Sequence, residues 1–283
     1  MSFGMGWEIL WPLILGFALS GVIQAVVSKR QMSKLLPDDK PKTLGLATAL
    51  GAASSSCSYA AVALARSLVK KGANFTAAMA FEIASTNLVF EIAIILVILL
   101  GWQFAAAEFV GGPIMIVILA VLFRRYLTPK MVALATKQAE KGLRGKMEGH
   151  AMMDDMAVKG NAPLFKKLVS KEGKTATSHF YVMDWASIWK DLAIGLLIAG
   201  AVAAWVPERF FQKLFISSHP LIAAIWGPLI GPLIAVISFV CSVGNIPLAA
   251  VLWNGGISFG GVVAFIFADL IVIPILRIYK KYY

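Results

Sequence analysis

Both cysteines of this 283-residue chain belong to one pattern that occurs twice. Cys57 and Cys241 are each followed by a serine, and they occupy equivalent places in two stretches, residues 54–84 and 238–268. A cysteine thiolate is a soft ligand that binds thiophilic ions. A free cysteine in an apolar segment can equally be a small packing residue without chemistry. The sequence leaves these two interpretations open.

The same two places carry hydroxyl, amide and glycine residues that could contact a polar solute. They are Ser54, Ser55, Ser56 and Ser58 around the first cysteine, and Ser242, Gly244 and Asn245 after the second. Helices that begin after the cysteines would direct their partly positive N-terminal ends toward these groups, which favours an anionic or polar solute. Serine also lets helices pack closely in membranes, so a structural role is the alternative.

Three acidic residues, Glu82, Glu91 and Asp269, lie inside long apolar runs. A charged side chain at the centre of a bilayer costs ~2.5–3.5 kcal/mol on the insertion scale, so each needs a partner or water. In the register of the two stretches Asp269 corresponds to Ser85, which shares a helical face with Glu82. Glu82 and Asp269 are therefore candidates for proton coupling. A structural ion pair, with Arg66 as the nearest partner, is the alternative.

No motif in the sequence indicates familiar enzymatic chemistry. It has no P-loop, no G-x-S-x-G turn and no zinc-ligand spacing. Neither cysteine has a His, Asp or Glu close to it in sequence, which disfavours a closed metal cage. We therefore expect no enzyme, no metal and no cofactor. The alternative is an intramembrane thiol or sulfur-transfer protein in which Cys57 or Cys241 is a nucleophile.

The two stretches match without a gap in one constant register, in which Cys57 corresponds to Cys241. Eleven positions are identical: Ser54/Ser238, Cys57/Cys241, Ser58/Ser242, Leu64/Leu248, Ala65/Ala249, Leu68/Leu252, Gly72/Gly256, Phe75/Phe259, Ala80/Ala264, Phe81/Phe265 and Ala84/Ala268. Some matching is expected by chance in so apolar a chain, but cysteine, glycine and two phenylalanines in one register indicate an internal duplication. Many membrane transporters are built from such repeats.

Composition indicates that these elements lie in a membrane. Hydrophobic residues make up 59% of the chain, and several apolar runs approach the ~20 residues that a helix needs to cross a bilayer. The formal net charge of +11 comes from short basic segments between the apolar runs. This is the distribution that the positive-inside rule produces. We therefore expect contact with anionic lipid headgroups and no nucleic-acid partner. Assembly into a homo-oligomer stays open.

The chain divides into a first membrane repeat at 1–127, a basic cytoplasmic linker at 128–184 and a second membrane repeat at 185–283. The spans predicted outside the core stretches are 9–28, 73–100, 105–123, 186–206 and 257–276. The core stretches themselves are 43–71 and 221–255. The distribution of charge predicts how the core stretches cross the membrane. If each enters and returns on one side, Lys70, the linker and the basic C-terminus all lie inside, and an acidic 101–108 turn lies outside.

Length supports this topology. As one helix, residues 43–71 would run well beyond the ~30 Å hydrocarbon core at ~1.5 Å per residue. Divided at Ser54–Ser58, they give two half-helices that meet near the midplane, and the second copy enters from the opposite side. We therefore predict an all-α polytopic protein of the inner cell membrane with two inverted repeats. Each repeat would contain a broken or re-entrant helical hairpin with a Cys-Ser break.

The repeated stretches resemble a known family. The run Cys241-Ser242-Val243-Gly244-Asn245-Ile246-Pro247 is similar to its C-S-C-G-x-x-P signature, and Arg66…Lys70-Lys71-Gly72 followed by Ala80-Phe81…Ala84-Ser85 resembles its continuation. The family is the predicted permease superfamily that includes the bacterial organoarsenical efflux permeases. The resemblance implies a permease. With the inverted repeats, it predicts a secondary transporter that moves a small polar or thiophilic solute by alternating access at a midplane site. The second cysteine of the signature is Val243 here and Tyr59 in the first copy.

Overall fold

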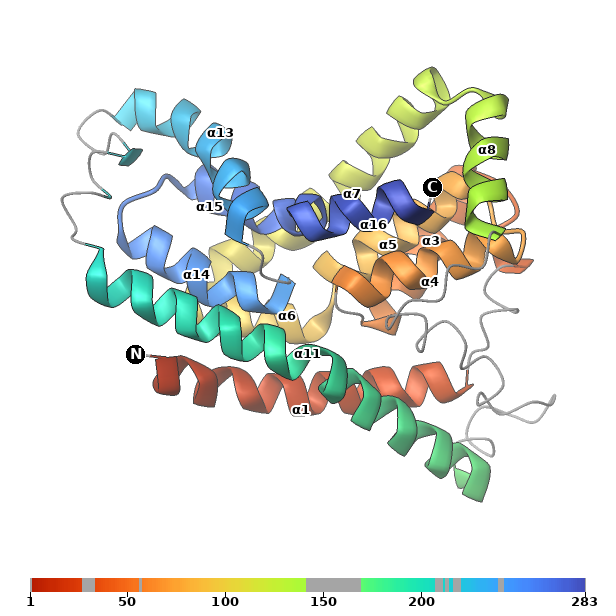
Figure 1. Ribbon diagram of the computed structural model, residues 1–283, viewed down its shortest axis with the longest axis horizontal. Helices are drawn as coiled ribbons and strands as arrows, with labels where there is room; N and C mark the ends of the chain where they lie inside the picture. Colours follow the sequence, from red (N-terminus) through yellow and green to blue (C-terminus); the bar gives the residue numbers. More distant parts are fainter. Residues whose placement is uncertain are drawn as a thin grey trace. The chain divides into compact units, whose positions relative to one another are not determined.

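A computed structural model of the chain describes residues 2–26, 34–55, 58–140, 169–206, 211, 214–215, 220–238 and 242–282. Three candidate site residues, Ser56, Cys57 and Cys241, lie outside the described residues, as do residues 141–168 of the predicted linker. Within the described residues every regular element is a helix and no strand occurs (Figure 1). The all-α class expected from the sequence is therefore confirmed for that part of the chain.

The helices follow one another in this order: α1 (Ser2–Val26), α3 (Pro41–Ser54), α4 (Ser58–Lys70), α5 (Phe75–Asn87), α6 (Phe90–Leu99), α7 (Trp102–Tyr126), α8 (Pro129–Glu140), α11 (Lys171–Trp205), α13 (Pro220–Ser238), α14 (Ser242–Asn254), α15 (Phe259–Phe267), the 3-10 helix η3 (Ala268–Ile271) and α16 (Ile273–Tyr282). The described ends of the stretch predicted as a linker are helical, since α8 lies at its beginning and α11 starts at Lys171.

The helices form two compact units. Unit 1 comprises Met1–Leu13, Glu91–Phe109 and Ile188–Leu276, and unit 2 comprises Ile14–Phe90, Val110–Ser187 and Arg277–Tyr283. Unit 2 therefore contains α3, α4 and α5, which hold the first repeated stretch and the residues before it, whereas unit 1 contains α13, α14 and α15, which hold the second stretch and the residues before it. Each unit is described below by itself.

In unit 2, α3 and α4 both pack against α5. Helix α5 is buried from Thr76 to Asn87, so it presents no face to the surroundings. The contact with α3 is very close, because a Cβ atom added to Gly51 would lie 2.4 Å from the carbonyl oxygen of Phe81. Small residues allow such backbone approaches between membrane helices. Helices α3 and α4 thus both pack on one buried helix.

In unit 1, α13 and α14 both pack against α15 and against η3. Helix α14 is buried from Ser242 to Leu252. Glycine again permits the closest contact, since a Cβ atom added to Gly231 would lie 2.3 Å from the carbonyl oxygen of Gly261. The packing pattern of α13, α14 and α15 is therefore the same as that of α3, α4 and α5.

The turn between the second and third helices of each copy has the same local structure. Gly72 has φ +90° and Gly256 has φ +92°, a left-handed conformation that glycine adopts without a steric penalty. The following amide bonds back across the helix end in both copies, from Ala73 N to the Leu68 carbonyl at 3.0 Å and from Ile257 N to the Leu252 carbonyl at 3.2 Å. These bonds satisfy carbonyl groups that the end of the helix leaves free.

The helix that follows each turn is capped in the same way. The Asn74 side chain accepts a hydrogen bond from Ala77 N at the start of α5, and the Ser258 side chain accepts one from Gly261 N at the start of α15. Both caps satisfy an amide that has no partner within the first helical turn. All these paired positions correspond in the register that aligns Cys57 with Cys241, so the duplication in sequence is also a duplication of local structure.

The spans predicted at 73–100 and 257–276 as single helices are each interrupted in the structure. Helix α5 ends at Asn87 and α6 starts at Phe90, while η3 ends at Ile271 and α16 starts at Ile273. The two interruptions stand at equivalent places in the repeat. Taken across them, Phe75–Leu99 and Phe259–Lys280 are still long and apolar enough to cross a membrane.

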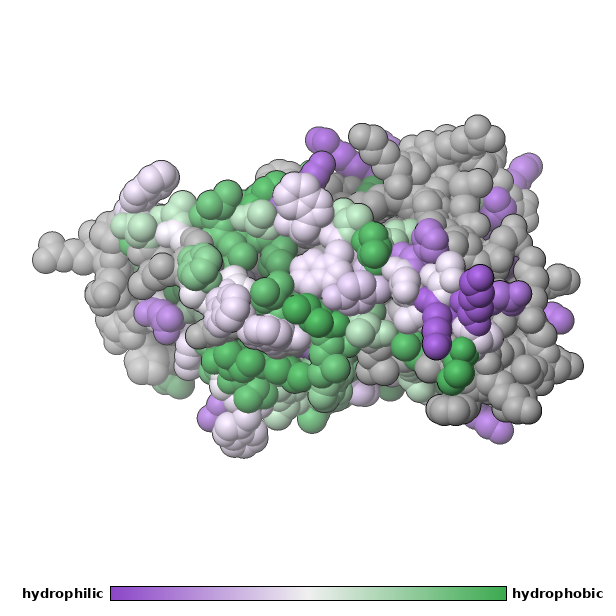
Figure 2. Space-filling model, turned by 90° about the horizontal axis from the view of Figure 1, so that it is seen from below, coloured by the Kyte–Doolittle hydropathy of each residue, from purple (hydrophilic) through white to green (hydrophobic). Residues whose placement is uncertain are grey.

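Two further segments among the described residues meet the same criterion, Trp102–Tyr126 and Leu221–Ser238. Both expose apolar side chains along one face. On α13 the exposed positions include Leu221, Ile225, Leu229 and Leu233, which recur every four residues and so form one helical stripe. Figure 2 shows hydrophobic residues over a broad part of one molecular surface. Helices with one exposed apolar face and a buried opposite face suit a lipid environment.

The acidic turn predicted at 101–108 is wrong. The turn is confined to Leu100 and Gly101, and α7 begins at Trp102. Gly101 adopts φ +111°, and its amide donates to the Leu96 carbonyl at 2.9 Å, which ends α6 abruptly. Glu108 therefore lies in the second turn of α7 and is buried rather than in an exposed loop.

Candidate functional site

The first predicted break lies between α3 and α4 in unit 2. Ser54, Ser55 and Ser58 are all buried. The Ser54 hydroxyl donates to the Gly51 carbonyl at 2.9 Å, within the last turn of α3. Ser55 has φ +36°, which is uncommon for a residue with a side chain. Such backbone strain persists only where the surroundings enforce it, and it concentrates at functional sites.

The second predicted break lies between α13 and α14 in unit 1. The Ser238 hydroxyl donates to the Ala235 carbonyl at 2.8 Å, which repeats the bond of Ser54 at the equivalent place in the second copy. It also lies 3.4 Å from the Asn245 side-chain oxygen. Ser242 and Gly244 are buried in the first turn of α14. The two described sides of this break are thus joined by a side-chain hydrogen bond.

Asn245 is fully buried, and its side-chain Nδ2 has no hydrogen-bond partner among the described residues. An amide that is buried without a partner for its donors costs free energy of roughly 1–3 kcal/mol. A solute acceptor or an ordered water would satisfy it. This is the property expected of a residue that contacts a polar solute.

Glu82 lies in the middle of α5 and is 1% exposed. The Tyr279 hydroxyl of α16, in the same unit, donates a hydrogen bond to Glu82 Oε1. Tyr279 was not singled out from the sequence, because 197 residues separate it from Glu82 and no local pattern connects them. A phenol–carboxylate contact of this kind holds the acidic side chain in one orientation.

Arg66, the alternative partner considered for Glu82, is also buried in unit 2. Its Nε donates to the carbonyl of Ala139 at 3.1 Å and so ties α4 to the end of α8. A guanidinium that satisfies a helix-terminal carbonyl has a structural function.

Asp269 lies in η3 of unit 1 and is fully buried. Another buried carboxyl group of the same unit is that of Glu108 on α7. Glu108 is 1% exposed, and its Oε1 has no hydrogen-bond partner among the described residues. Glu108 is not among the candidate residues found from the sequence, because the predicted 101–108 turn contains it. Gly101 was the sequence signal that could have been used, because a glycine after an apolar run marks the end of one helix and allows the next to begin directly after it.

Glu91 occupies the first turn of α6 and is also buried, in the same unit as Glu108 and Asp269. A carboxylate in this position interacts favourably with the helix dipole. Glu82, on the other hand, belongs to unit 2. Glu82 therefore lies within the first repeated stretch and Asp269 directly after the second, each on a helical segment against which α3 and α4, or α13 and α14, pack.

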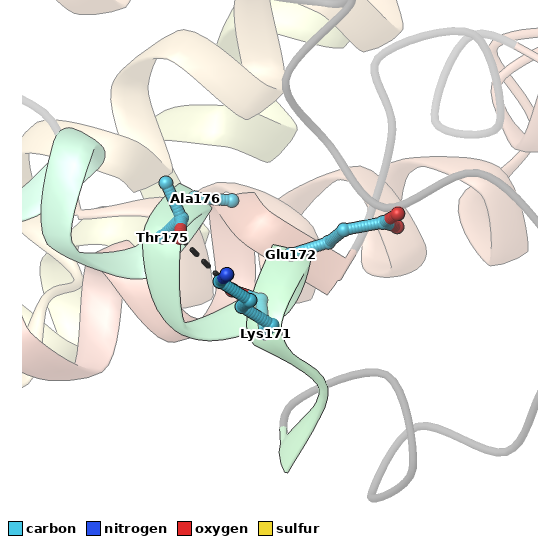
Figure 3. Close-up of a pocket in the computed structure, with 4 residues that line it drawn as sticks. All are labelled: Lys171, Glu172, Thr175 and Ala176. Carbon is cyan, nitrogen blue, oxygen red and sulfur yellow. Dashed lines mark hydrogen bonds between the residues drawn. The ribbon is translucent and has the colours of Figure 1, made fainter.

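A shallow hollow lies at the start of α11 in unit 2, where Lys171, Glu172, Thr175 and Ala176 line it (Figure 3). The Thr175 hydroxyl donates to the Lys171 carbonyl at 2.9 Å, so it is satisfied within the helix. The polar lining residues are exposed, unlike the serines and acidic residues of the candidate site. Among the described residues, no group of three or more His, Cys, Asp or Glu could hold a metal ion.

Comparison with known proteins identifies a family over the whole chain and a relative over most of it. A family model described as "Predicted permease" matches residues 1–283. "Putative permease Rv2963" of Mycobacterium tuberculosis is 64% identical over 258 residues, which are 91% of this chain and 63% of that protein. The chain thus spans less than two-thirds of the length of this curated relative. No solved structure matched the chain.

Proposed function

The chain belongs to the predicted permease family, and we propose that it acts as a secondary transporter that moves a small polar or thiophilic solute across the inner cell membrane. The strongest support is the local structure that recurs in the register of the two repeated stretches. Two glycine turns, two helix caps and two serine bonds match in this register. Duplicated helical cores with interrupted helices are a common architecture of secondary transporters.

In this proposal the two copies are inverted repeats, and the serine and cysteine residues at their breaks contact the solute. Ser54, Ser55, Ser56, Ser58 and Cys57 would act from the first copy, and Ser242, Gly244, Asn245 and Cys241 from the second. The Nδ2 of Asn245, which is buried and has no hydrogen-bond partner in the described part of the chain, supports solute contact at the second break. Alternating access would expose this site to one side of the membrane at a time.

The solute class follows from the chemistry of the same residues. Hydroxyl and amide groups suit a polar or anionic solute, and a thiol at each break suits a thiophilic one. Organoarsenical efflux is the specific activity that the family resemblance suggests. The departure from the signature at Val243 leaves one thiol per break, so a trivalent arsenical would meet at most two cysteines.

Glu82 and Asp269 would carry protons or shape the electric field at the site. Each is buried on a helical segment that packs against both half-helices of its own copy. Burial in an apolar environment disfavours the charged form of a carboxyl group, so such a group exchanges protons when water reaches it. A proton gradient could then drive solute movement.

Flux measurements in proteoliposomes test this proposal. A panel of trivalent arsenicals, small thiols and oxyanions would be offered with and without a pH gradient, with protein-free liposomes as the control. We expect flux of at least one solute class and a clear increase when the gradient is applied. Turnover of a thiol compound in detergent without any flux would instead support the intramembrane thiol or sulfur-transfer alternative.

A further inference from the structure

Asn87 carries a buried amide in unit 2 that the proposed site does not use. It is the last residue of α5 and is 2% exposed. Its side-chain Nδ2 has no hydrogen-bond partner among the residues that the structure describes. A buried donor without a partner destabilises the folded state, and native structures contain few such groups. Asn87 is therefore a candidate for contact with a molecule that the chain itself does not supply.

Helices α3 and α5 lie side by side and run in the same direction (Figure 1). At the beginning of α5, the Asn74 amide donates to the carbonyl of Leu36, in the connector before α3, at 2.8 Å. Farther along both helices, Gly51 of α3 closely approaches Phe81 and Ala84 of α5. These contacts occur in the same order along both segments, so the two helices are parallel.

Both helices end one turn beyond this close approach. A Cβ atom added to Gly51 would lie 2.9 Å from the Cβ atom of Ala84, so these two positions face each other. Three residues farther, on the same helical faces, α3 ends at Ser54 and α5 ends at Asn87. Ser54, like Asn87, is 2% exposed. The break after α3 and the interruption after α5 therefore lie at the same level of unit 2.

The hydroxyl groups that precede Asn87 are bonded within α5. Ser85 donates to the carbonyl of Glu82 at 2.8 Å, and Thr86 donates to the carbonyl of Ile83 at 3.1 Å. Both hydroxyl donors are thus used by the helix itself. The Nδ2 of Asn87 makes no comparable bond in the described part of the chain. At the end of α5, the amide of Asn87 is therefore the donor best suited to a solute.

We propose that Asn87 belongs to the solute site at the first break, where its Nδ2 donates a hydrogen bond to an oxygen atom of the solute. The presence of a solute rests on the proposed function. A buried donor of this kind selects for solutes that carry an acceptor, because a solute without one leaves the amide unpaired. Ile271 stands at the equivalent place in the second copy, so this selection acts from the first copy.

The unfolding temperature of the purified protein in detergent, without any solute, provides the first test. Asn87→Leu removes the amide and keeps a side chain of similar volume. We expect the variant to unfold at the wild-type temperature or above it, because replacing a buried unpaired group by an apolar one is neutral or stabilising. A clear decrease would overturn the proposal, since it would show that the amide stabilises the fold.

Probe binding provides the second test, because a ligand that binds the folded state raises the unfolding temperature. The probes are sulfate, phosphate, arsenate and a trivalent methylarsenical, whose arsenic carries hydroxyl groups in water. At least one of them should stabilise the wild-type protein, and Asn87→Leu should bind that probe roughly tenfold more weakly. Asn87→Asp keeps the shape but replaces the donors with acceptors, so it should lose the same binding.

Thr86→Val is the matched control on the neighbouring residue. Thr86 is also buried, but its hydroxyl is bonded within α5. The substitution should lower the unfolding temperature and leave the affinity for the probe unchanged. An equal loss of affinity in Thr86→Val and Asn87→Leu would overturn the proposal, because it would indicate a general disturbance of the helix end.

Three further results would overturn the assignment. They are a wild-type protein that none of the probes stabilises, equal probe affinity in wild type and Asn87→Leu, and stabilisation by sodium that is stronger in Asn87→Asp than in wild type. The last result would assign the position to a metal cation. None of these measurements requires flux, so a protein without transport activity can still bind a probe through Asn87. Transport by a protein that fails these tests would refute the role of Asn87 alone.

Discussion

The contact between Tyr279 and Glu82 joins the last helix of the chain to the most buried helix of unit 2. Tyr279→Phe removes the donor and keeps the ring, so the carboxyl group loses one hydrogen bond. Bonds to charged groups contribute ~1.5–3 kcal/mol, and we expect a lower unfolding temperature in detergent. Tyr126→Phe is the control because that side chain is exposed. In a Glu82→Gln background the Tyr279→Phe effect should shrink, and an undiminished effect would show that the hydroxyl stabilises something else.

The two cysteines support a separate prediction at the residue scale. If both breaks contribute to one solute site, Cys57→Ser and Cys241→Ser should each lower the flux of trivalent arsenicals and thiols at least several-fold, while oxyanion flux changes less. Serine keeps the size and polarity but not the soft sulfur ligand. The yield of folded, membrane-inserted protein should stay at the wild-type level. Wild-type flux by the double variant across the whole panel would assign both residues to packing.

For single residues, the sequence is a better guide to which acidic side chains are buried than to which side chains contact them. Glu82 and Asp269 were recognised because an acidic residue in an apolar run is conspicuous, and both are buried. Glu108 and Tyr279 were missed for different reasons. Glu108 was assigned to the wrong element, whereas Tyr279 meets Glu82 only through a contact between distant segments. No local pattern in one sequence encodes such a contact.

At the scale of elements, the register of the two copies is a better guide to matching local structure than the sequence is to where the spans end. The identity of Gly72 and Gly256 was a signal that could have predicted the two equivalent turns, because glycine readily adopts a positive φ. The interruption after Asn87 was not foreseen, since Leu88 and Val89 are apolar and carry no breaker signal. Near the equivalent interruption in the second copy, Pro274 was a signal that could have been used.

Close packing between α3 and α5 provides a prediction with a control on the same helix. Gly51→Ala places a methyl group 2.4 Å from the Phe81 carbonyl oxygen, so the helices must separate. Overpacking of this kind costs ~1–3 kcal/mol, and the unfolding temperature should fall. Gly45→Ala should leave stability unchanged or raise it slightly, because nothing lies within 4 Å and alanine favours the helix. Equal effects of the two substitutions would contradict the close approach.

At the scale of the whole molecule, apolar surface and basic loops together constrain how the chain lies in a membrane. Helix α7 exposes Val110, Ile114, Val117 and Val121 along its length, and the basic pair Arg124 and Arg125 follows in its last turn. Arg124 Nε lies 2.6 Å from a carboxylate oxygen of Asp39 in the connector before α3. An apolar face that ends at arginines is typical of a membrane helix whose basic end lies in the cytoplasm.

Accessibility of single cysteines tests the topology that follows from this charge distribution. In a background of Cys57→Ser and Cys241→Ser, Lys71→Cys and Lys171→Cys should react with a membrane-impermeant thiol reagent only from the cytoplasmic side. Trp102→Cys and Asn254→Cys should react only from the outside. All four positions are exposed in their own units, so slow labelling would not result from burial. Gly255 is a poorer site, because a Cβ atom there would lie 2.8 Å from the Phe211 ring.

Labelling of Lys71→Cys and Asn254→Cys distinguishes parallel copies from inverted ones. The two residues stand at the ends of equivalent half-helix pairs, just before Gly72 and Gly256, so parallel copies would place both on one side of the membrane. Inverted copies place them on opposite sides, as the positive-inside rule requires for a basic turn at Lys70 and Lys71 and an uncharged one at 254–256. Right-side-out and inside-out vesicles should therefore give opposite labelling for these two variants. Labelling of both from one side would exclude the inverted repeats, and labelling of Lys71→Cys from outside would exclude the hairpins.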